Sequence, residues 1–243
     1  MAAEGQTAGL AQEGEVFTLD PRAAGLNGEA FTADALRFAD YDLIVQASDG
    51  PTFTEAGYLP ITGFSLAGQP IAPAGLDDPG GAGWGAYMRI TGSGTSGLSP
   101  DGLPSAVYDQ LSYEIVGFNG SATYGFDADG NVVVGGAISD PVTLAAGSLL
   151  AGSVAFVPAS PAGGLTIEGA VSLVVDEVAP GFAAGRLDVL DLSILHPPED
   201  YSLLSPTETQ VAAGSGTNGA FASWDTVAAQ VTRNFEETGH WFY

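Results

Sequence analysis

Residues Gly164 to Asp176 constrain the fold of this chain most strongly, because apolar and polar side chains alternate along them. The apolar parity consists of Leu165, Ile167, Val171, Leu173 and Val175, and the polar parity of Thr166, Glu168, Ser172 and Asp176. A period of two is typical of a β-strand with one face in a core and the other in water. At roughly 3.3 Å per residue the strand would extend about 40 Å, which implies a large antiparallel sheet.

Further apolar or alternating segments lie between clusters of Gly and Pro. We expect strands at residues 15–20, 39–45, 85–94, 110–118, 121–126, 132–138, 149–157 and 187–195. Asn119-Gly120 and residues 126–131 have the composition of tight hairpin turns. Residues 224–235 fit a short helix or a strand equally well. Many strands without a strong helical segment before residue 220 predict an all-β fold, a large antiparallel β-sandwich or a related β-rich fold with long strands and Gly/Pro-rich loops.

The composition predicts one folded domain. The chain has 243 residues and is 45% hydrophobic, enough for a sizeable core despite 35 Gly and 15 Pro. Residues 1–14 are mainly Ala, Gly, Gln and Glu, and we expect a flexible leader before a single β-rich domain of residues 15–243. The opening Met-Ala-Ala-Glu-Gly-Gln lacks the basic and apolar regions of a signal peptide and is similar to the start of a mature exported protein.

Charge and cysteine content exclude several classes of function. The chain has 29 acidic residues against five Arg and no Lys, a net charge of −24, which repels phosphate backbones and anionic lipid surfaces. We therefore expect neither nucleic acid nor membrane surfaces as partners. There is no run of 18 apolar residues, so no membrane span is expected. The absence of Cys excludes disulfides and thiolate metal sites, and two His are too few for a His-rich zinc site.

Several short motifs occur in a defined order along the chain. They are Phe31-Thr32-Ala33-Asp34, Gly83-Trp84-Gly85-Ala86-Tyr87 followed by Gly94-Thr95, the run Gly147–Gly152, and the polar residues 216–223 before a group of aromatics. In this order they resemble the flocculation-associated PEP-CTERM family of exported bacterial proteins, over residues 31–243. The chain departs from that family in having no Pro-Glu-Pro sorting signal followed by an apolar span. The resemblance implies a secreted, non-catalytic protein of an extracellular or biofilm matrix that acts in cell aggregation.

Asp127, Asp129 and Asn131 place side-chain oxygens at alternate positions of one turn, the spacing that calcium loops use. The bidentate Glu of such loops is missing, because Ile138 stands at the twelfth position. An Asp-Gly turn explains the same residues by backbone preference. Both readings stay open, and calcium is the cofactor that the sequence suggests, although none is required.

Trp84, Tyr87, Trp224 and Trp241 are candidates for contact with carbohydrate or a protein partner, since exposed aromatic rings stack on sugars. Core packing explains them as well. The apolar chain end from His240 to Tyr243 is expected to dock in a groove or to join a neighbouring molecule as an added strand. Self-association into a homo-oligomer or filament follows from the second option.

Two acidic pairs are the candidates for glycoside hydrolysis, Glu199-Asp200 and Glu236-Glu237 beside His240. Adjacent residues of a strand point to opposite faces, and no Gly-x-Ser-x-Gly motif is present, so we assign no catalytic residue and do not expect an enzyme. The sequence favours a secreted structural or adhesive protein that acts through self-association or polysaccharide binding. A lectin-type carbohydrate-binding module is the first alternative, and a glycoside-active enzyme with an acidic pair is the second.

Overall fold

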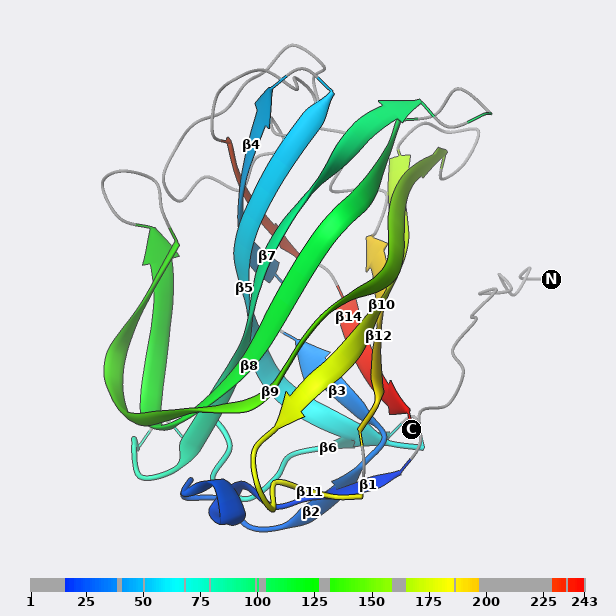
Figure 1. Ribbon diagram of the computed structural model, residues 1–243. Helices are drawn as coiled ribbons and strands as arrows, with labels where there is room; N and C mark the ends of the chain where they lie inside the picture. The colour runs from blue at the N-terminus through cyan, green and yellow to red at the C-terminus, as the bar shows by residue number, and fades with distance from the viewer. Residues whose placement is uncertain are drawn as a thin grey trace, which may run out of the picture.

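The computed structural model is built from β-strands (Figure 1). It describes residues 16–38, 41–49, 51–67, 69–78, 80–98, 100, 104–126, 132–158, 165–185, 187–196, 229–234 and 236–242. The strands are β1 (Phe17–Leu19), β2 (Phe31–Ala33), β3 (Ala35–Phe38), β4 (Tyr41–Asp49), β5 (Thr52–Leu66), β6 (Gln69–Ile71), β7 (Trp84–Leu98), β8 (Pro104–Phe126), β9 (Val132–Pro158), β10 (Leu165–Val178), β11 (Ala183–Ala184), β12 (Val189–His196), β13 (Ala229–Asn234) and β14 (Glu236–Phe242). A short 3-10 helix, η1 (Pro21–Ala24), follows β1. The prediction of an all-β chain with long antiparallel strands is confirmed.

Eleven of the described strands form one sheet, in the order β13-β4-β5-β3-β14-β12-β10-β9-β8-β7, with β6 beside β5. β5 also pairs with β7, from Thr52 opposite Thr95 to Ile61 opposite Ala86. Because of this additional pairing, the sheet curls around its own inner face like a half-barrel. The predicted sandwich is wrong in this respect: the large sheet packs mainly against itself and not against a second sheet of similar size.

The length of the strands explains the curl. β8 has 23 residues and β9 has 27. At roughly 3.3 Å per residue, a flat strand as long as β9 would extend about 90 Å. The register shifts between Ile115 and Val116 and between Gly117 and Asn119, in the pairing of β8 with β9. Such irregularities bend strands and increase their twist, so the sheet wraps and does not stay flat.

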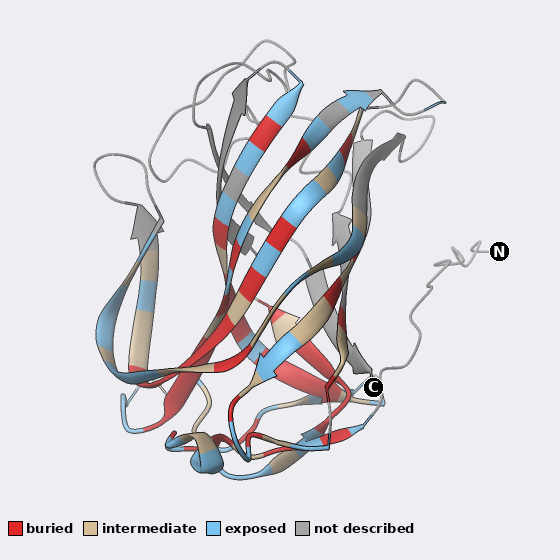
Figure 2. Ribbon diagram, in the orientation of Figure 1, coloured by how far each residue is buried: buried red, intermediate tan, exposed pale blue. Residues whose placement is uncertain are grey.

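Side chains alternate between the inner and outer faces of the curled sheet, as the sequence predicts. On β7, Trp84, Met88 and Ile90 are buried, whereas Arg89 and Thr91 are exposed. On β10, the predicted apolar parity is buried at Val171 and Leu173, and Asp176 of the polar parity is exposed. Figure 2 shows the resulting bands of buried and exposed residues along β5, β7 and β8.

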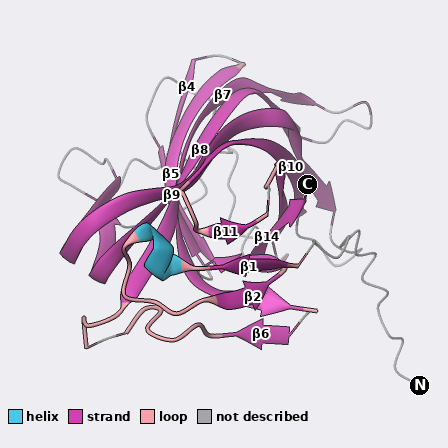
Figure 3. Ribbon diagram, turned by 60° about the horizontal axis from the view of Figure 1, so that its bottom comes forward, coloured by secondary structure: helices cyan, strands magenta, loops and turns pink. Residues whose placement is uncertain are grey.

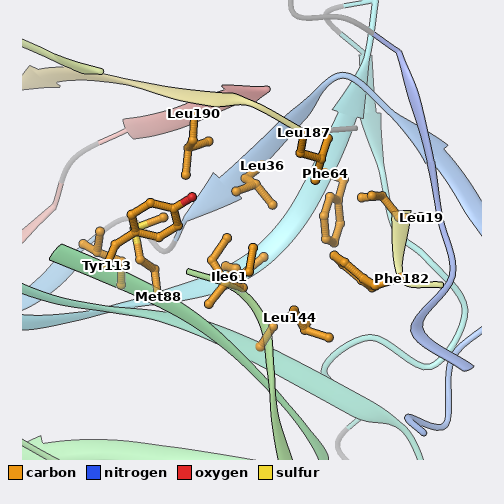
Figure 4. Close-up of a cluster of buried hydrophobic side chains, with 14 of the residues drawn as sticks. Leu19, Leu36, Ile61, Phe64, Met88, Tyr113, Leu144, Phe182, Leu187 and Leu190 are labelled. Atoms are coloured by element: carbon orange, nitrogen blue, oxygen red, sulfur yellow. The ribbon is translucent and has the colours of Figure 1, made fainter. Parts of the chain in front are cut away.

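A small sheet, in the order β11-β1-β2, covers one end of the curled sheet (Figure 3). Leu19 of β1 and Phe182 before β11 are almost fully buried there, together with Phe64 of β5 and Leu144 of β9 (Figure 4). The core therefore forms between the small sheet and the inner face of the large one. Fully burying each of these side chains contributes about 1.5–3 kcal/mol.

Two buried polar side chains attach loops to this core. Asn119 accepts a hydrogen bond from the Asn27 amide at 2.7 Å and donates one to the Gly25 carbonyl at 3.2 Å. Asp34 accepts a hydrogen bond from the amide of Ala67 at 2.6 Å, where Ala67 has a φ of 50°. Since buried polar groups are costly without partners, each side chain fixes one loop conformation.

Local expectations differ from the structure at two places, and the sequence leaves a third place open. Asn119-Gly120 is not a turn, because β8 continues through it, and Gly120 with a φ of 102° forms a bend within the strand. The two strands predicted at residues 132–138 and 149–157 are one continuous strand, β9. In the ambiguous segment 224–235, the described residues are β13, which pairs with β4. The predicted leader, residues 1–14, lies outside the described residues.

Candidate functional site

The polar outer face of β5, β7, β8 and β9 brings together side chains that are distant in sequence. In the strand pairings, Tyr58 lies opposite Arg89, and Arg89 lies opposite Glu114. Two residues further along these strands, Thr91 lies opposite Ser112, and Ser112 lies opposite Ser148 of β9. We call this surface the outer face.

An aromatic cluster occupies one part of the outer face. The ring of Tyr87 lies 5.4 Å from that of Tyr58, 6.1 Å from that of Tyr124 and 6.0 Å from that of Phe118, measured between centroids. The three tyrosines are partly exposed and Phe118 is buried beneath them. These spacings lie in the range at which aromatic rings attract one another. Gly85 makes room for the cluster, because a Cβ there would lie 2.5 Å from the Phe118 ring.

A hydrogen-bonded ion pair borders the aromatic cluster. The guanidinium of Arg89 donates to one carboxylate oxygen of Glu114, and the hydroxyl of Thr143 donates to the other. The Arg89 side chain is 52% exposed and that of Glu114 is 25% exposed. Because both oxygens of Glu114 have donors, the carboxylate has a fixed orientation, while part of the guanidinium stays accessible to a ligand.

A row of hydroxyl groups continues from the ion pair. The hydroxyls of Thr91 and Ser112 lie 2.7 Å apart, and the Ser148 hydroxyl donates to the Asp176 carboxylate at 3.1 Å. A hollow of about 500 Å³ opens here, lined by Thr91, Gly92, Ser93, Asp109, Gln110, Leu111, Ser112, Ser148 and Leu149. Its side chains offer hydroxyl, amide and carboxylate groups together. Such a lining can hydrogen-bond a ligand that carries many hydroxyls.

Burial and neighbouring charges move the pKa values of two groups of the site, Tyr87 and Arg89, further from neutral pH. Burial raises the pKa of Tyr87 above its usual value, with the nearby Tyr58 and Glu114 acting in the same direction. Burial alone would lower the pKa of Arg89, but the carboxylate of Glu114 outweighs this and the pKa is raised. Tyr87 is therefore a neutral phenol and Arg89 a cation. Neither has the shift toward neutral pH that acid–base catalysis requires.

The structure separates the four aromatic residues that the sequence singles out. Tyr87 is the centre of the aromatic cluster. Trp84 has no exposed surface and lies in the core, where its indole donates to the Ala74 carbonyl at 3.2 Å. Trp241 is described only as a backbone position of β14 opposite Leu190. Trp224 lies outside the described residues.

The predicted calcium residues Asp127, Asp129 and Asn131 also lie outside the described residues. The strands on either side are antiparallel partners, since Phe126 pairs with Val132. Of the acidic pairs, residues 199–200 lie outside the described chain, and residues 236–237 are placed only as backbone of β14. Within the part of the chain that is described, no three His, Cys, Asp or Glu side chains are grouped closely enough to hold a metal ion.

Sequence reasoning did not find Tyr58, Tyr124, Arg89, Glu114 or the hydroxyl row. Each is ordinary in its own segment and gains significance through its neighbours across the sheet. The available signal was parity: Arg89 and Thr91 alternate with the apolar residues of β7. Parity indicates that both face outward, but the partner strand and its register were needed to assemble the site.

None of the described helical residues forms a helix long and apolar enough to span a membrane. Comparison of the chain with protein families, with characterised proteins and with solved structures gives no match.

Proposed function

We propose that the protein is a secreted adhesive or matrix protein whose outer face binds a neutral polysaccharide without converting it. The observation that carries this proposal is the aromatic cluster around Tyr87, which lies next to the Arg89–Glu114–Thr143 network and the hydroxyl-lined hollow. The resemblance of the short motifs to exported cell-aggregation proteins supports the same class of function and an extracellular location.

The chemistry of the outer face suits a sugar chain. The apolar C–H face of a pyranose ring can pack on an aromatic ring, and the aromatic cluster offers partly exposed tyrosine rings for this contact. The hydroxyls around the edge of the sugar need donors and acceptors, which Arg89, Ser112 and Gln110 offer beside the cluster. Because these groups belong to paired strands, they are held in place before binding, which lowers the entropic cost of association.

The charge of the chain selects among polysaccharides. A net charge of −24 repels uronic acids and sulfated sugars, so we expect neutral glycans to bind more tightly than acidic ones at low salt. Arg89 does not overcome this repulsion, since Glu114 neutralises it locally. The alternative is a calcium ion that bridges carboxylates of the protein and of an acidic glycan.

The outer face favours binding over hydrolysis. A glycoside hydrolase needs two carboxyl groups that face the scissile bond, one of them free to donate a proton. The carboxylate of the network beside the aromatic cluster is Glu114, and one of its oxygens accepts a hydrogen bond from Arg89 and the other from Thr143. A lectin-type module would use the same surface, and it differs from a matrix protein in its state of assembly.

A glycan array followed by titration calorimetry tests the proposal. We expect a neutral glycan to bind, and Tyr87→Ala to weaken binding about two- to tenfold, since aromatic stacking contributes about 0.5–1.5 kcal/mol. Tyr87→Phe should bind nearly as well because the ring is kept. The control is Val16→Ala, because Val16 is an exposed residue directly before β1. Glycan binding that is insensitive to Tyr87→Ala would refute the site. Release of reducing ends during incubation would show that the protein hydrolyses the glycan, and would refute binding without conversion.

A further inference from the structure

A two-stranded ribbon extends from the large sheet, which we call the arm: residues 119–126 of β8 and 132–139 of β9 (Figure 1, green, left). The pairing of β7 with β8 ends at Trp84 opposite Asn119. The pairing of β10 with β9 begins only at Val178 opposite Ala145. Among the described strands, therefore, the stretch of β9 from Val133 to Ser139 has β8 on one side and no strand on the other.

The exposed edge of the arm lacks the features that usually prevent sheets from joining. Protein edges are commonly blocked by charged residues, by proline or by very short strands. Residues 132–139 read Val-Val-Val-Gly-Gly-Ala-Ile-Ser, without charge or proline, and Asp140 and Pro141 follow immediately at the base of the arm. Val133 is 41% exposed, and Gly135 to Ala137 are exposed as well. The edge is thus open and rich in β-branched residues, which favour strand pairing.

The shape of the arm is fixed by glycine. Gly120 and Gly136 have φ values of 102° and 99°, and a Cβ on Gly120 would lie 1.9 Å from the Ala137 carbonyl oxygen. Other residues adopt such angles only with strain. Tyr124 on one side of the arm contacts Tyr87 of the sheet. The ribbon therefore leaves the sheet along a defined path with its β9 edge available.

We propose that the β9 edge of the arm pairs antiparallel with the same edge of a second copy of the chain, which joins two arms into a four-stranded sheet. An antiparallel pair of identical segments has two-fold symmetry, so the same residues serve both partners. A two-stranded ribbon is only marginally stable in water and gains from additional strands.

The acidic net charge of the chain opposes association with a second copy least at this uncharged edge. Two chains of −24 each repel one another over most of their surfaces, and an uncharged edge is a place where they can approach at little electrostatic cost. The proposal is independent of polysaccharide binding, because the edge residues differ from those of the aromatic cluster and the hollow.

Sedimentation equilibrium over a wide range of protein concentration tests the pairing. We expect a reversible monomer–dimer equilibrium with more dimer at high salt, because salt screens the repulsion between the acidic chains. Ala137→Lys puts two like charges at the new interface and should weaken the dimer about tenfold or more. Val16→Lys, the same charge change at an exposed position outside the arm, should leave it unchanged. Circular dichroism establishes that each variant is folded.

The absence of cysteine allows a second measurement on a nearly unaltered protein. Single variants Val133→Cys, Gly135→Cys and Ala137→Cys are oxidised at low concentration, with Val16→Cys as the control. At least one arm variant should form a disulfide-linked dimer much faster than the control. A chain that is monomeric at every concentration and salt overturns the proposal. A dimer that tolerates Ala137→Lys and gives no arm-specific cross-link overturns it too, because another surface then forms the contact.

Discussion

Removing one oxygen atom from the interior should stabilise the protein. Tyr113 of β8 is 3% exposed, and its hydroxyl has no hydrogen-bond partner in the part of the chain that is described. Figure 4 shows the hydroxyl directed toward the apolar side chains of Leu36 and Leu190. A buried hydroxyl without a partner loses its hydrogen bonds to water on folding and gains none in return. Tyr113→Phe removes this cost and keeps the ring.

The size of the effect follows from the cost of an unsatisfied buried polar group, about 1–3 kcal/mol. In a chain of this length each kcal/mol raises the melting temperature by about 2–4 °C, so Tyr113→Phe should raise it by about 2–12 °C. The measurement is thermal and urea denaturation. The control is Tyr87→Phe, whose partly exposed hydroxyl can bind water, and which should change the free energy of unfolding by less than about 0.5 kcal/mol.

The same residue gives a pH signature. Burial, and secondarily the Asp176 carboxylate, raises the pKa of Tyr113 above its ordinary value of 10.0. The folded chain therefore keeps this proton at a pH where the unfolded chain releases it. The ionisation of Tyr113 therefore leaves the free energy of unfolding unchanged below about pH 10. Above that pH the free energy of unfolding falls, by up to about 1.4 kcal/mol per pH unit, because the unfolded chain loses the proton first. Between pH 9 and pH 11 the Tyr113→Phe variant should lose less free energy of unfolding than the unaltered protein does. The difference should equal roughly the effect of ionising one tyrosine. A variant that is destabilised at pH 7 would refute this reasoning, because the hydroxyl would then have a partner.

Three other variants test the fold and the site. Gly120→Ala should lower the free energy of unfolding by about 1–3 kcal/mol in urea titrations, because its Cβ would collide with the Ala137 carbonyl, whereas Gly97→Ala, with open space around it, should have little effect. Asn119→Ala should cost about 1–3 kcal/mol in the same assay, since it removes two part-buried hydrogen bonds, to the Asn27 amide and the Gly25 carbonyl. Arg89→Ala should change stability by less than about 1 kcal/mol, because its ion pair is half exposed, but should weaken glycan binding in calorimetry; equal binding would exclude Arg89 from the site.

The prediction from sequence succeeded where the pattern is local. Parity along residues 171–176 identified which side chains of β10 enter the core, because the pleat of a strand converts alternation directly into two faces. The hairpin predicted across residues 126–131 agrees with the pairing of its flanking strands, since Phe126 lies opposite Val132, and residues 127–131 themselves lie outside the described residues. Both conclusions need only the geometry of a few consecutive residues.

The prediction failed where the answer depends on strand partners. Asn119-Gly120 has the composition of a type I′ turn, yet the buried Asn119 side chain holds the η1 loop and β8 continues past Gly120. The sandwich was wrong because the pairing between β5 and β7 curls the sheet onto itself. Trp84 and Tyr87 differ by three positions and therefore face opposite sides, so one lies in the core and the other in the aromatic cluster. Composition does not distinguish them, whereas parity along β7 does, since Tyr87 shares the parity of Arg89 and Trp84 shares that of Met88.

The curl itself explains why the outer face can act as a binding surface. In a sandwich, two sheets share the work of covering one core, whereas here the inner face of one sheet and a small cap bury the apolar parity. The opposite parity then lies on a continuous convex surface, where cross-strand pairs such as Tyr58 with Arg89 and Thr91 with Ser112 are neighbours. Substitutions at these positions change what the surface contacts while the core stays packed. Binding should therefore be separable from stability at Tyr58 and Arg89, and inseparable from it at Phe118, whose buried ring lies against Tyr87.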